Sequence, residues 1–490
     1  MDQKHDNSGI GEKNSKSKDK VRNLNREIVL ITYVFVGLFT LLSIYFGYFL
    51  FVDSDDVINS SYNKRQDLLA ERIIRGEIQG SNGETLAKTT VDQEGNTKRV
   101  YPYNEMFAHV VGKFDKGKTG IEATENFKLL TSHNNPVLMV YNELSGEKNP
   151  GDTIVTTLDV KLQEVAYHAL GNQKGAIVVL EPSTGKILAM VSKPDYNPNN
   201  ARKNWEELTN DSNNNSALVN RATQGLYPPG STYKILTALE YIRENEKTYN
   251  KYAYTCQGSE IFNSVSINCY GGEKHGKLDL LHSFSKSCNT SFANIGTRLN
   301  MDSFRKLNET LLFNQKLPTN IPYKRSSFVL DSTSEKSEIP QTVIGQGKTL
   351  ISPFHNALIT ATIANGGTLM KPYTVDRITN SSGTLVKKNV PDTYGNLIST
   401  KEAEILTKMM KEVVTSGTGS ALNNIGVSVA GKTGTAEYSN NKKESHAWFV
   451  GFAPTDKPQL VVSIIVEGAG TGSAHAVPIA KRIFQEYFNR

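Results

Sequence analysis

One long apolar segment stands near the start of the chain. Residues 28–52 contain no charged side chain and are rich in Val, Ile, Leu, Phe and Tyr. About 20 such residues span a bilayer as a helix, so this segment can cross a membrane with some tilt. It is longer than the apolar part of a typical signal peptide, and no small-x-small cleavage site follows it. We therefore predict a retained transmembrane helix at 28–52.

The charges on the two sides of this segment differ in sign. Residues 1–27 are rich in Lys, Asn and Ser, whereas Asp53, Asp55 and Asp56 follow the segment directly. Basic residues near a membrane helix stay on the cytoplasmic side. We therefore expect 1–27 to form a cytoplasmic tail and the rest of the chain to lie outside the cell membrane.

Further along the chain, two pairs of apolar runs each flank a turn. Residues 176–180 and 187–191 surround a Pro-Ser-Thr-Gly sequence, and residues 447–452 and 460–466 surround a Pro-containing turn. Apolar runs of this length around turn residues are typical of β-hairpins. The sequence therefore predicts one hairpin near the start of the long C-terminal region and another near its end.

Helical patterns occupy the space around these hairpins. Asp159 is placed to cap a helix over 160–170. Helical stretches follow at 231–244 and 401–415, and an amphipathic helix at 478–488 ends the chain. Strands at both ends with helices between them predict one mixed sheet covered by helices, an α/β (α+β) fold.

Length and composition add a domain division. The 490 residues exceed one ordinary domain, and 38% are hydrophobic, enough for a large core. Residues 53–150 are mixed, with short strand-like runs and turns, and the regular pattern begins at about 151. We predict a tail at 1–27, the membrane helix, a first external region at 53–150 and a large domain at 151–490. The net charge of +6 is modest for this length and does not favour a nucleic-acid partner.

A serine and a lysine stand at helical spacing at the start of the stretch 231–244. Two prolines and a glycine end the preceding segment, so Ser231 lies in the first turn and Lys234 returns to the same face. A serine hydroxyl needs a nearby base to act as a nucleophile, and a lysine serves when burial lowers its pKa. The helix N-terminus favours developing negative charge. This pair is therefore a candidate nucleophile and base.

Motifs as short as Ser-x-x-Lys recur by chance along the chain. The order in which three such motifs follow one another identifies the relevant copies. A second Lys-Thr-Gly, at 118–120, precedes the serine and lies outside the large domain. The serine–lysine pair, a Ser-x-Asn and a Lys-Thr-Gly together form a known catalytic set in one order along the chain. That order is met here by Ser231 and Lys234, then Ser287 and Asn289, then Lys432, Thr433 and Gly434.

With these motifs, the region from about 150 to 490 resembles the transpeptidase domain of penicillin-binding proteins. Gly345-Gln346-Gly347 and the run 363–367 resemble further landmarks of that family. Arg75-Gly76-Glu77-Ile78 resembles the start of the pedestal in class B members, although Gly80-Ser81 replaces the usual acidic and basic pair. The resemblance implies a penicillin-binding/serine β-lactamase-like domain at 151–490 and a strand-containing, dimerisation-like pedestal at 53–150.

The resemblance also implies an activity, peptidoglycan D,D-transpeptidation, with a role for each matching residue. Ser231 would attack a stem peptide ending in D-Ala-D-Ala, release D-Ala and form an acyl-enzyme, and penicillins would acylate the same serine. Lys234 would be its base. Ser287 and Asn289 would relay protons or hold the substrate amide, and Lys432 would attract the terminal carboxylate. No cofactor is expected for catalysis.

The strand that carries the third motif would also bind substrate. Thr433 and Thr435 would donate hydrogen bonds, and Gly434 would let a substrate backbone lie against the strand as an added strand. The backbone N–H groups of Ser231 and Thr435 would form the oxyanion hole.

Cysteine and histidine residues near the second motif suggest a separate site. Cys256, Cys269 and His275 lie within 20 residues in a Gly-rich stretch. Their spacing suits a small structural zinc site, a disulfide between the two cysteines, or free thiols. Candidates for a fourth ligand are Glu273, Asp279 and His282. Cys288 is assigned to the second motif, where it replaces the more familiar Asp, and it is not expected to be a nucleophile.

Two other functions compete with transpeptidation. A membrane-anchored serine β-lactamase or D,D-carboxypeptidase needs a base for its deacylating water, and the glutamate loop of class A β-lactamases is not found. A non-catalytic β-lactam sensor would be expected to carry more membrane segments and a cytoplasmic effector, and a degenerate scaffold would be expected to lack Ser231 or Lys234. The resemblance further implies a single-pass protein of the bacterial cell membrane. Its partner would be a glycosyltransferase of the shape, elongation, division and sporulation (SEDS) family, contacted through the membrane helix and 53–150.

Overall fold

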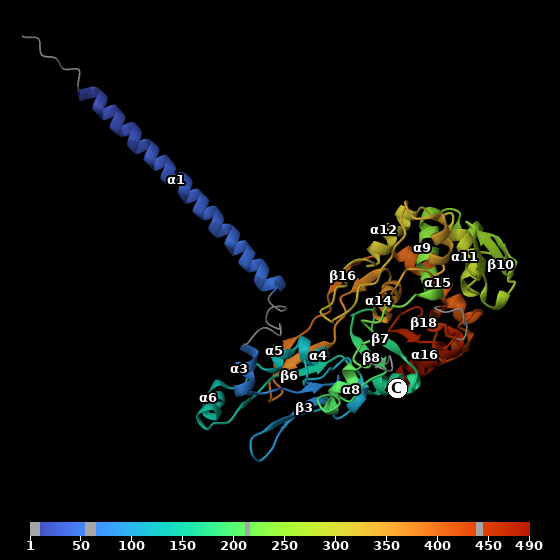
Figure 1. Ribbon diagram of the computed structural model, residues 1–490, viewed down its shortest axis with the longest axis horizontal. Helices are drawn as coiled ribbons and strands as arrows, with labels where there is room; N and C mark the ends of the chain where they lie inside the picture. Colours follow the sequence, from blue (N-terminus) through green and yellow to red (C-terminus); the bar gives the residue numbers. More distant parts are fainter. Residues whose placement is uncertain (1–9, 54–64, 211–215, 438–443) are drawn as a thin grey trace, which may run out of the picture. The chain divides into compact units, whose positions relative to one another are not determined.

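The structure is a computed structural model that describes residues 10–53, 65–210, 216–437 and 444–490 (Figure 1). The chain divides into two units, residues 1–65 and residues 66–490. The first unit is the helix α1 (Ile10–Tyr48), continued by one π-helical turn, η1 (Phe49–Asp53). This helix begins earlier than the predicted segment 28–52. Residues 1–9 of the predicted tail lie outside the described residues.

The apolar part of α1 has the properties of a membrane span. Residues Arg26–Phe51 are long and apolar enough to cross a bilayer, and their apolar side chains are exposed. The hydroxyl groups of Thr32, Thr40 and Ser43 each donate to a backbone carbonyl four residues earlier. Polar groups that are satisfied within the helix can enter lipid at low cost. The helix therefore fits a single-pass membrane anchor.

A six-stranded sheet forms the first part of the second unit. Its strand order is β15-β14-β6-β2-β3-β4. Residues from beyond position 150 complete it, because β6, β14 and β15 come from later parts of the chain. The strands are β2 (Ile78–Gln79), β3 (Thr85–Val91), β4 (Thr97–Val100), β6 (Thr153–Thr156), β14 (Val375–Thr379) and β15 (Leu385–Lys388).

A buried ion-pair network holds this region together. Glu122 is fully buried and accepts from Arg75 Nε at 2.6 Å and from Arg99 Nε at 2.7 Å. Burial raises the pKa of Glu122, but the two guanidinium charges outweigh this effect and leave the pKa below its ordinary value. A Cβ on Gly76 would lie 1.8 Å from the carbonyl oxygen of Asp152. The Arg75-Gly76 signature therefore pairs a buried charge with a close backbone contact.

The large domain is built on a five-stranded antiparallel sheet in the order β17-β18-β19-β7-β8. The strands β7, β18 and β19 are almost entirely buried, because helices cover both faces. Their residues are accordingly apolar on both sides, which explains the continuous runs in the sequence. The strands are β7 (Gly175–Leu180), β8 (Ile187–Lys193), β17 (Ala430–Ala436), β18 (His446–Ala453) and β19 (Leu460–Val466).

Two groups of helices cover this sheet. The helices α7 (Val160–Leu170) and α16 (Gly472–Phe488) bury their apolar sides in one core. On the other face lies a larger core that includes α9 (Lys234–Glu244), α14 (Pro353–Ala364) and α15 (Thr400–Thr415). The candidate site lies on this second face, at the start of α9.

Shorter elements surround these layers. Between α9 and α14 the chain forms small helices and two hairpin pairings, β9 with β12 and β10 with β11. The elements are β9 (Tyr254–Cys256), β10 (Ser259–Phe262), β11 (Val265–Asn268), β12 (Gly276–Leu278), α10 (Leu280–Ser285), α11 (Asn289–Gly296), α12 (Met301–Thr310) and α13 (Ile339–Thr342). Elsewhere lie α3 (Arg65–Arg72), α4 (Gly120–Thr124), α5 (Asn126–Leu129), α6 (Pro136–Leu144), α8 (Trp205–Thr209), β1 (Ile73–Ile74), β5 (Asn149–Pro150), β13 (Thr368–Met370) and β16 (Thr393–Asn396).

Most of the predicted elements are present. The mixed α/β architecture and both hairpins are confirmed, and Asp159 caps α7 by accepting from the N–H of Leu162. The stretch 231–244 begins as a 3-10 turn, η4 (Gly230–Tyr233), before α9. The last helix begins at Gly472 rather than 478, because its Pro478 lies inside the helix instead of starting it.

Candidate active site

A tight turn presents Ser231 at the start of α9. Gly230 has a φ of +53°, and its N–H donates to the carbonyl of Gly345 at 2.9 Å. A Cβ on Gly345 would lie 1.9 Å from the carbonyl oxygen of Gly230. The indole N–H of Trp448 donates to the carbonyl of Pro228 at 3.0 Å. The turn before Ser231 is therefore fixed by backbone contacts that only glycine permits.

Lys234 is fully buried beneath this turn and bonds to the second motif. Its Nζ donates to Ser287 O at 2.7 Å, to Asn289 Oδ1 at 2.6 Å and to Ser287 Oγ at 3.3 Å. Burial lowers the pKa of Lys234 to about 8, although charge on Cys288 and Cys269 acts in the opposite direction. The first two motifs are thus joined through one amine of lowered basicity.

In its neutral form, Lys234 has one lone pair left for a further interaction. A neutral lysine amine has two N–H groups and one lone pair. The two short bonds, to Ser287 O and Asn289 Oδ1, use both N–H groups. Within the described residues no hydrogen bond joins Lys234 Nζ to Ser231 Oγ, so that predicted contact is not made here. In structures without substrate such catalytic contacts are often long.

The backbone of the second motif is held in an uncommon conformation. Ser287 has a φ of +54°, a left-handed value that is uncommon for residues other than glycine. Cys288 then donates its N–H to Ser283 O at 2.9 Å and caps α11, which begins at Asn289. Such conformations concentrate at functional sites. Here the bend turns both the carbonyl of Ser287 and the amide of Asn289 toward Lys234.

The third motif lies on β17, the edge strand of the large sheet. Lys432 is fully buried, and its Nζ donates to Thr433 O at 3.1 Å. Burial, followed by the charge of Lys234, lowers the pKa of Lys432 well below its ordinary value. Thr433 is bonded through its hydroxyl to Thr418, a residue that the sequence analysis did not single out.

Gly434 allows β17 to approach the turn that carries Ser231. A Cβ at this position would lie 3.0 Å from Trp448 Cβ, 3.1 Å from Thr232 Cγ2 and 3.2 Å from Pro229 O. On the same strand, Thr435 O lies 2.7 Å from the position of a Cβ on Gly230. The strand and the turn therefore pack backbone against backbone, which explains why small residues occupy both.

All three motifs meet at one cleft of about 990 Å³. Lys234 and Lys432 lie buried below it rather than in its lining. The other six predicted residues line it: Ser231, Ser287, Asn289, Thr433, Gly434 and Thr435. The structure thus brings together residues from three segments that are far apart in the sequence.

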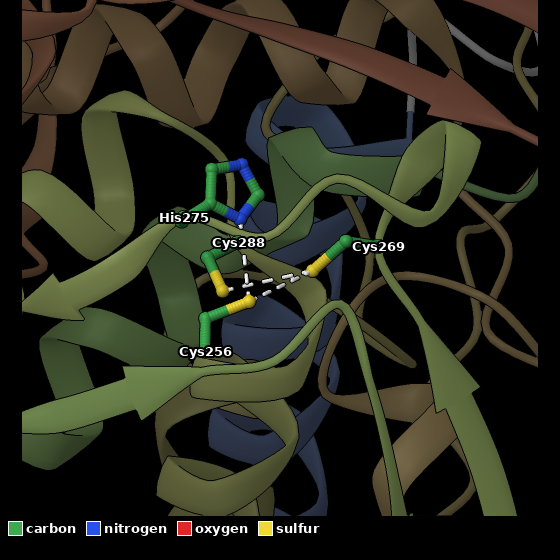
Figure 2. A group of neighbouring side chains, drawn as sticks. All are labelled: Cys256, Cys269, His275 and Cys288. Carbon is green, nitrogen blue, oxygen red and sulfur yellow. Dashed lines mark hydrogen bonds between the residues drawn. The ribbon is translucent and has the colours of Figure 1, made fainter.

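A cluster of sulfur and nitrogen atoms lies beside the second motif (Figure 2). The Sγ atom of Cys269 is 3.6 Å from that of Cys256 and 3.7 Å from that of Cys288, and Cys256 Sγ is 3.4 Å from His275 Nδ1. The four ligand atoms all lie within 4.8 Å of one another. All three cysteines are free thiols.

The fourth member of this cluster was not foreseen. The candidates Asp279 and His282 are wrong, because they pair with each other at the start of α10. Glu273 is wrong as a direct member too, since its carboxylate lies 3.6 Å from the other ring nitrogen of His275. Cys288 takes that place. Its membership could have been found only by relating its position in the second motif to the other two cysteines.

Hydrogen bonding among these groups favours negative charge on Cys269 but opposes it on Cys288, where the bond to Cys269 and then burial raise the pKa of the thiol. The hydrogen bond with Cys288 has the largest effect on the Cys269 thiol and lowers its pKa. Burial acts in the opposite direction, and the hydrogen bond with His275 lowers the pKa further. The bond to Cys269 raises the pKa of His275 to about 9. Thiolate sulfur is the form of cysteine that binds metal ions. The four residues Cys256, Cys269, His275 and Cys288 are therefore a chemically suitable set of ligands for a soft or borderline cation.

Two family models match this chain. The model described as "Penicillin binding protein transpeptidase domain" matches residues 175–485, and "Penicillin binding protein A dimerisation domain" matches residues 75–154. Among relatives, Peptidoglycan D,D-transpeptidase PbpA of Mycolicibacterium smegmatis is 30% identical over 85% of this chain and 90% of its own length. Penicillin-binding protein 3 of Bacillus subtilis is also 30% identical, over 86% of this chain and 69% of its own length.

Solved structures give the same result. Penicillin-binding protein A from M. tuberculosis, solved as an imipenem acyl-enzyme complex, is 30% identical with a TM-score of 0.77 over 86% of this chain and 99% of that one. The D,D-transpeptidase domain of a peptidoglycan glycosyltransferase from Eggerthella lenta is 29% identical with a TM-score of 0.76 over 86% of this chain and 100% of that one. This chain belongs to the penicillin-binding protein transpeptidase family, as a class B member.

Proposed function

We propose that this chain is a peptidoglycan D,D-transpeptidase that forms its acyl-enzyme on Ser231 and is covalently inhibited by β-lactams. The observation that carries the assignment of the site is the pair of short bonds from buried Lys234 to Ser287 and Asn289, beneath the cleft that Ser231 lines. Relatives named as D,D-transpeptidases and neighbours solved as β-lactam acyl-enzymes support the reaction class.

In the first half-reaction, Ser231 Oγ attacks the carbonyl carbon of the penultimate D-Ala. The lone pair of neutral Lys234 accepts the hydroxyl proton, which passes to the leaving nitrogen as the C–N bond breaks and D-Ala departs. A pKa of about 8 leaves about one-tenth of the lysine neutral at pH 7. The N–H groups of Ser231 and Thr435 stabilise the negative oxygen of the tetrahedral intermediate.

In the second half-reaction, an amine from another stem peptide attacks the ester carbon. The new C–N bond forms, the bond to Ser231 Oγ breaks, and the amine proton returns to Oγ through Lys234. Ser287 Oγ, at 3.3 Å from Lys234 Nζ, is placed to assist both proton transfers.

Residues of β17 would hold the donor peptide. Lys432 lies in an apolar, buried setting, where a substrate carboxylate would favour its protonated form. The hydroxyl groups of Thr433 and Thr435 line the cleft and are suitable donors to that carboxylate. The open edge of β17 at Gly434 suits a substrate backbone added as a further strand.

Labelling with a fluorescent penicillin tests this function. We expect a stable covalent adduct with the intact protein, none with Ser231→Ala, and a normal adduct with Ser473→Ala, which removes another hydroxyl from the same cleft. Rapid loss of the label with turnover of the drug would indicate a β-lactamase. A folded protein that is never acylated by penicillin or by a D-Ala-D-Ala depsipeptide would indicate a non-catalytic scaffold.

We also propose that Cys256, Cys269, His275 and Cys288 hold a structural zinc ion. Three thiolates and one imidazole are a common tetrahedral zinc set, and Glu273 stands behind the ring of His275, as carboxylates often do at such sites. When bound, the ion would supply a rigid cross-link between the second motif and the stretch 256–275. Cobalt substitution tests this, because thiolate ligation gives an intense charge-transfer band. The band should be lost in Cys269→Ser, which removes a central thiolate, and kept in His282→Ala.

The anchor and the partner complete the proposal. We infer that the helix Arg26–Phe51 crosses the cell membrane once with residues 1–27 in the cytoplasm, supported by the basic residues before it and the acidic ones after it. We further infer a boundary near 150 between a pedestal and the catalytic domain, and a SEDS glycosyltransferase partner. Co-purification of that partner, lost when the anchor is exchanged for an unrelated membrane helix, would support this partnership.

A further inference from the structure

Transpeptidation brings two stem peptides to one serine, and the proposed function accounts for the binding of only the donor. The cleft is large, at about 990 Å³, and its lining includes a second wall besides the three catalytic motifs. This wall is formed by the segment from β11 to Tyr270, which follows the hairpin β10–β11. The inference below rests on the proposed function and concerns what this second wall binds.

The wall meets the cleft with a strand edge. Ser266, Ile267, Asn268 and Cys269 are consecutive residues, and all of them line the cleft. Side chains alternate between the faces of a strand, so a cavity touched by consecutive residues lies against the backbone at the edge. No residue of β10 lines the cleft, and within the described ranges β11 pairs with β10 alone. The edge of β11 away from β10 therefore faces the cleft.

The hydrogen-bond pattern of the hairpin identifies which backbone groups point outward. The N–H of Cys269 donates to Gly258 O at 2.8 Å, so this opposing pair is a bonded one. Bonded and non-bonded pairs alternate along an antiparallel ladder. The register pairs Asn268 with Ser259 and Ser266 with Ile261. Asn268 and Ser266 therefore direct their N–H and C=O groups away from β10.

A contact in the structure agrees with this direction. The amide of Asn289 donates from Nδ2 to the carbonyl of Asn268 at 2.8 Å. The outward edge of β11 thus reaches the second motif, at a residue two positions after Ser287. The residue between the two outward positions, Ile267, is buried and fixes the strand against the core.

The base of the hairpin is fixed as well. Cys256 precedes β10 and Cys269 follows β11, and both belong to the cluster that includes Cys288 (Figure 2). The wall and the second motif are therefore parts of one rigid arrangement. The cleft has two strand edges along its sides, that of β17 and that of β11. On β11 the carbonyl of Asn268 is already bonded to Asn289, so the outward N–H and C=O of Ser266 and the outward N–H of Asn268 are the groups that an extended peptide can meet.

We propose that the outward edge of β11, at Ser266 and Asn268, is the acceptor subsite of this enzyme. It binds the backbone of the second stem peptide as an added strand, while the donor lies along β17. The free amine of the bound acceptor then reaches the ester carbon on Ser231. The C–N bond forms, the C–Oγ bond breaks, and the amine proton goes to Ser231 Oγ.

A proline on β11 removes one outward donor. Ser266→Pro deletes the N–H that faces the cleft and breaks no bond to β10, and proline is tolerated at such edge positions. The enzyme is acylated with a D-Ala-D-Ala thioester donor, and the products of aminolysis and hydrolysis are measured. The acceptors are a stem peptide with a free side-chain amine and, separately, D-alanine. With the stem peptide as acceptor, we expect the ratio of aminolysis to hydrolysis to fall about fivefold in Ser266→Pro, because one hydrogen bond of about 1 kcal/mol is lost.

Three controls separate the subsite from other effects. Ser259→Pro removes the matching outward N–H of β10, which does not face the cleft, and Ser266→Ala removes only the side chain. Both should keep the wild-type ratio. D-alanine is too short to pair with the strand, so its ratio should be unchanged in Ser266→Pro. Penicillin acylation, which needs only the donor side, should also be unchanged.

An unchanged stem-peptide ratio in Ser266→Pro would overturn the proposal. If that variant fails to react with penicillin and is therefore misfolded, the wild-type enzyme is tested with a stem acceptor whose backbone amides are N-methylated. A fall of about fivefold or more supports the subsite, and an unchanged ratio overturns it. Failure of the wild-type enzyme to react with penicillin or with the thioester donor would instead count against the proposed function.

Discussion

Replacing Asn289 by Asp tests whether Lys234 is the base. Asn289 Oδ1 lies 2.6 Å from Lys234 Nζ and carries no charge. Burial lowers the pKa of Lys234 from 10.5 to about 8. A carboxylate at the position of the amide would favour the charged lysine and raise this pKa by about 1–3 units. The lysine of the variant should therefore titrate at about 9–11.

The expected loss of activity follows from the sign of this change. Only the neutral amine can accept the proton of Ser231, so acylation speeds up as pH rises through the pKa of Lys234. Each unit by which the pKa rises reduces the neutral fraction at pH 7 about tenfold. Asn289→Asp should therefore be acylated about 10- to 1,000-fold more slowly at pH 7, and it should regain much of this loss at pH 10.

The measurement is the second-order rate of acylation by a fluorescent penicillin between pH 6 and pH 10. Asn289→Ala is the matched control, because it removes the amide without adding a charge. It should be slower at every pH while its midpoint stays near that of the wild type. The reasoning is refuted if the wild-type rate is flat between pH 7 and pH 9, or if Asn289→Asp has the wild-type midpoint.

Two further substitutions test the fold around the site. Glu122→Gln should lower the free energy of unfolding by about 3–5 kcal/mol, because Arg75 and Arg99 would stay buried without a compensating charge. Chemical unfolding of the detergent-solubilised protein measures this, and a loss under 1 kcal/mol would contradict it. Gly345→Ala should reduce penicillin acylation at least about 100-fold, since its Cβ would lie 1.9 Å from the carbonyl of Gly230 and displace the turn before Ser231. Wild-type labelling of this variant would show that the turn can move without cost.

The strongly patterned parts of the fold could be predicted from the sequence. The runs 176–180 and 460–466 are apolar throughout because both faces of their sheet are covered, and both are strands in the structure. The composition of the first sheet was harder to foresee. Its strand β14 comes from residues 375–379, and no local signal indicates that this short segment pairs with β6.

The candidate site was predictable where chemistry repeats in a fixed order. Ser231, Lys234 and Asn289 could be chosen because three short motifs occur in one sequence order. The role of Cys288 could not be predicted in this way. Its side chain joins the cysteine and histidine cluster, whereas its neighbours Ser287 and Asn289 bond to Lys234 in the active site. A bend with positive φ at Ser287 separates them, and backbone conformation of that kind has no marker when the residue is not glycine.

The order of strands in the large sheet has a consequence for biogenesis. The strand β19, near the end of the chain, pairs with β7, near the start of the domain, and carries β18 and β17 on its other side. Pairings between such distant segments form slowly, since most of the chain must be present before they can close. The catalytic cleft therefore comes into existence only after the last segment has been synthesised and delivered to the same compartment as the first. Reaction with penicillin is then a report of completed folding as much as of catalytic competence.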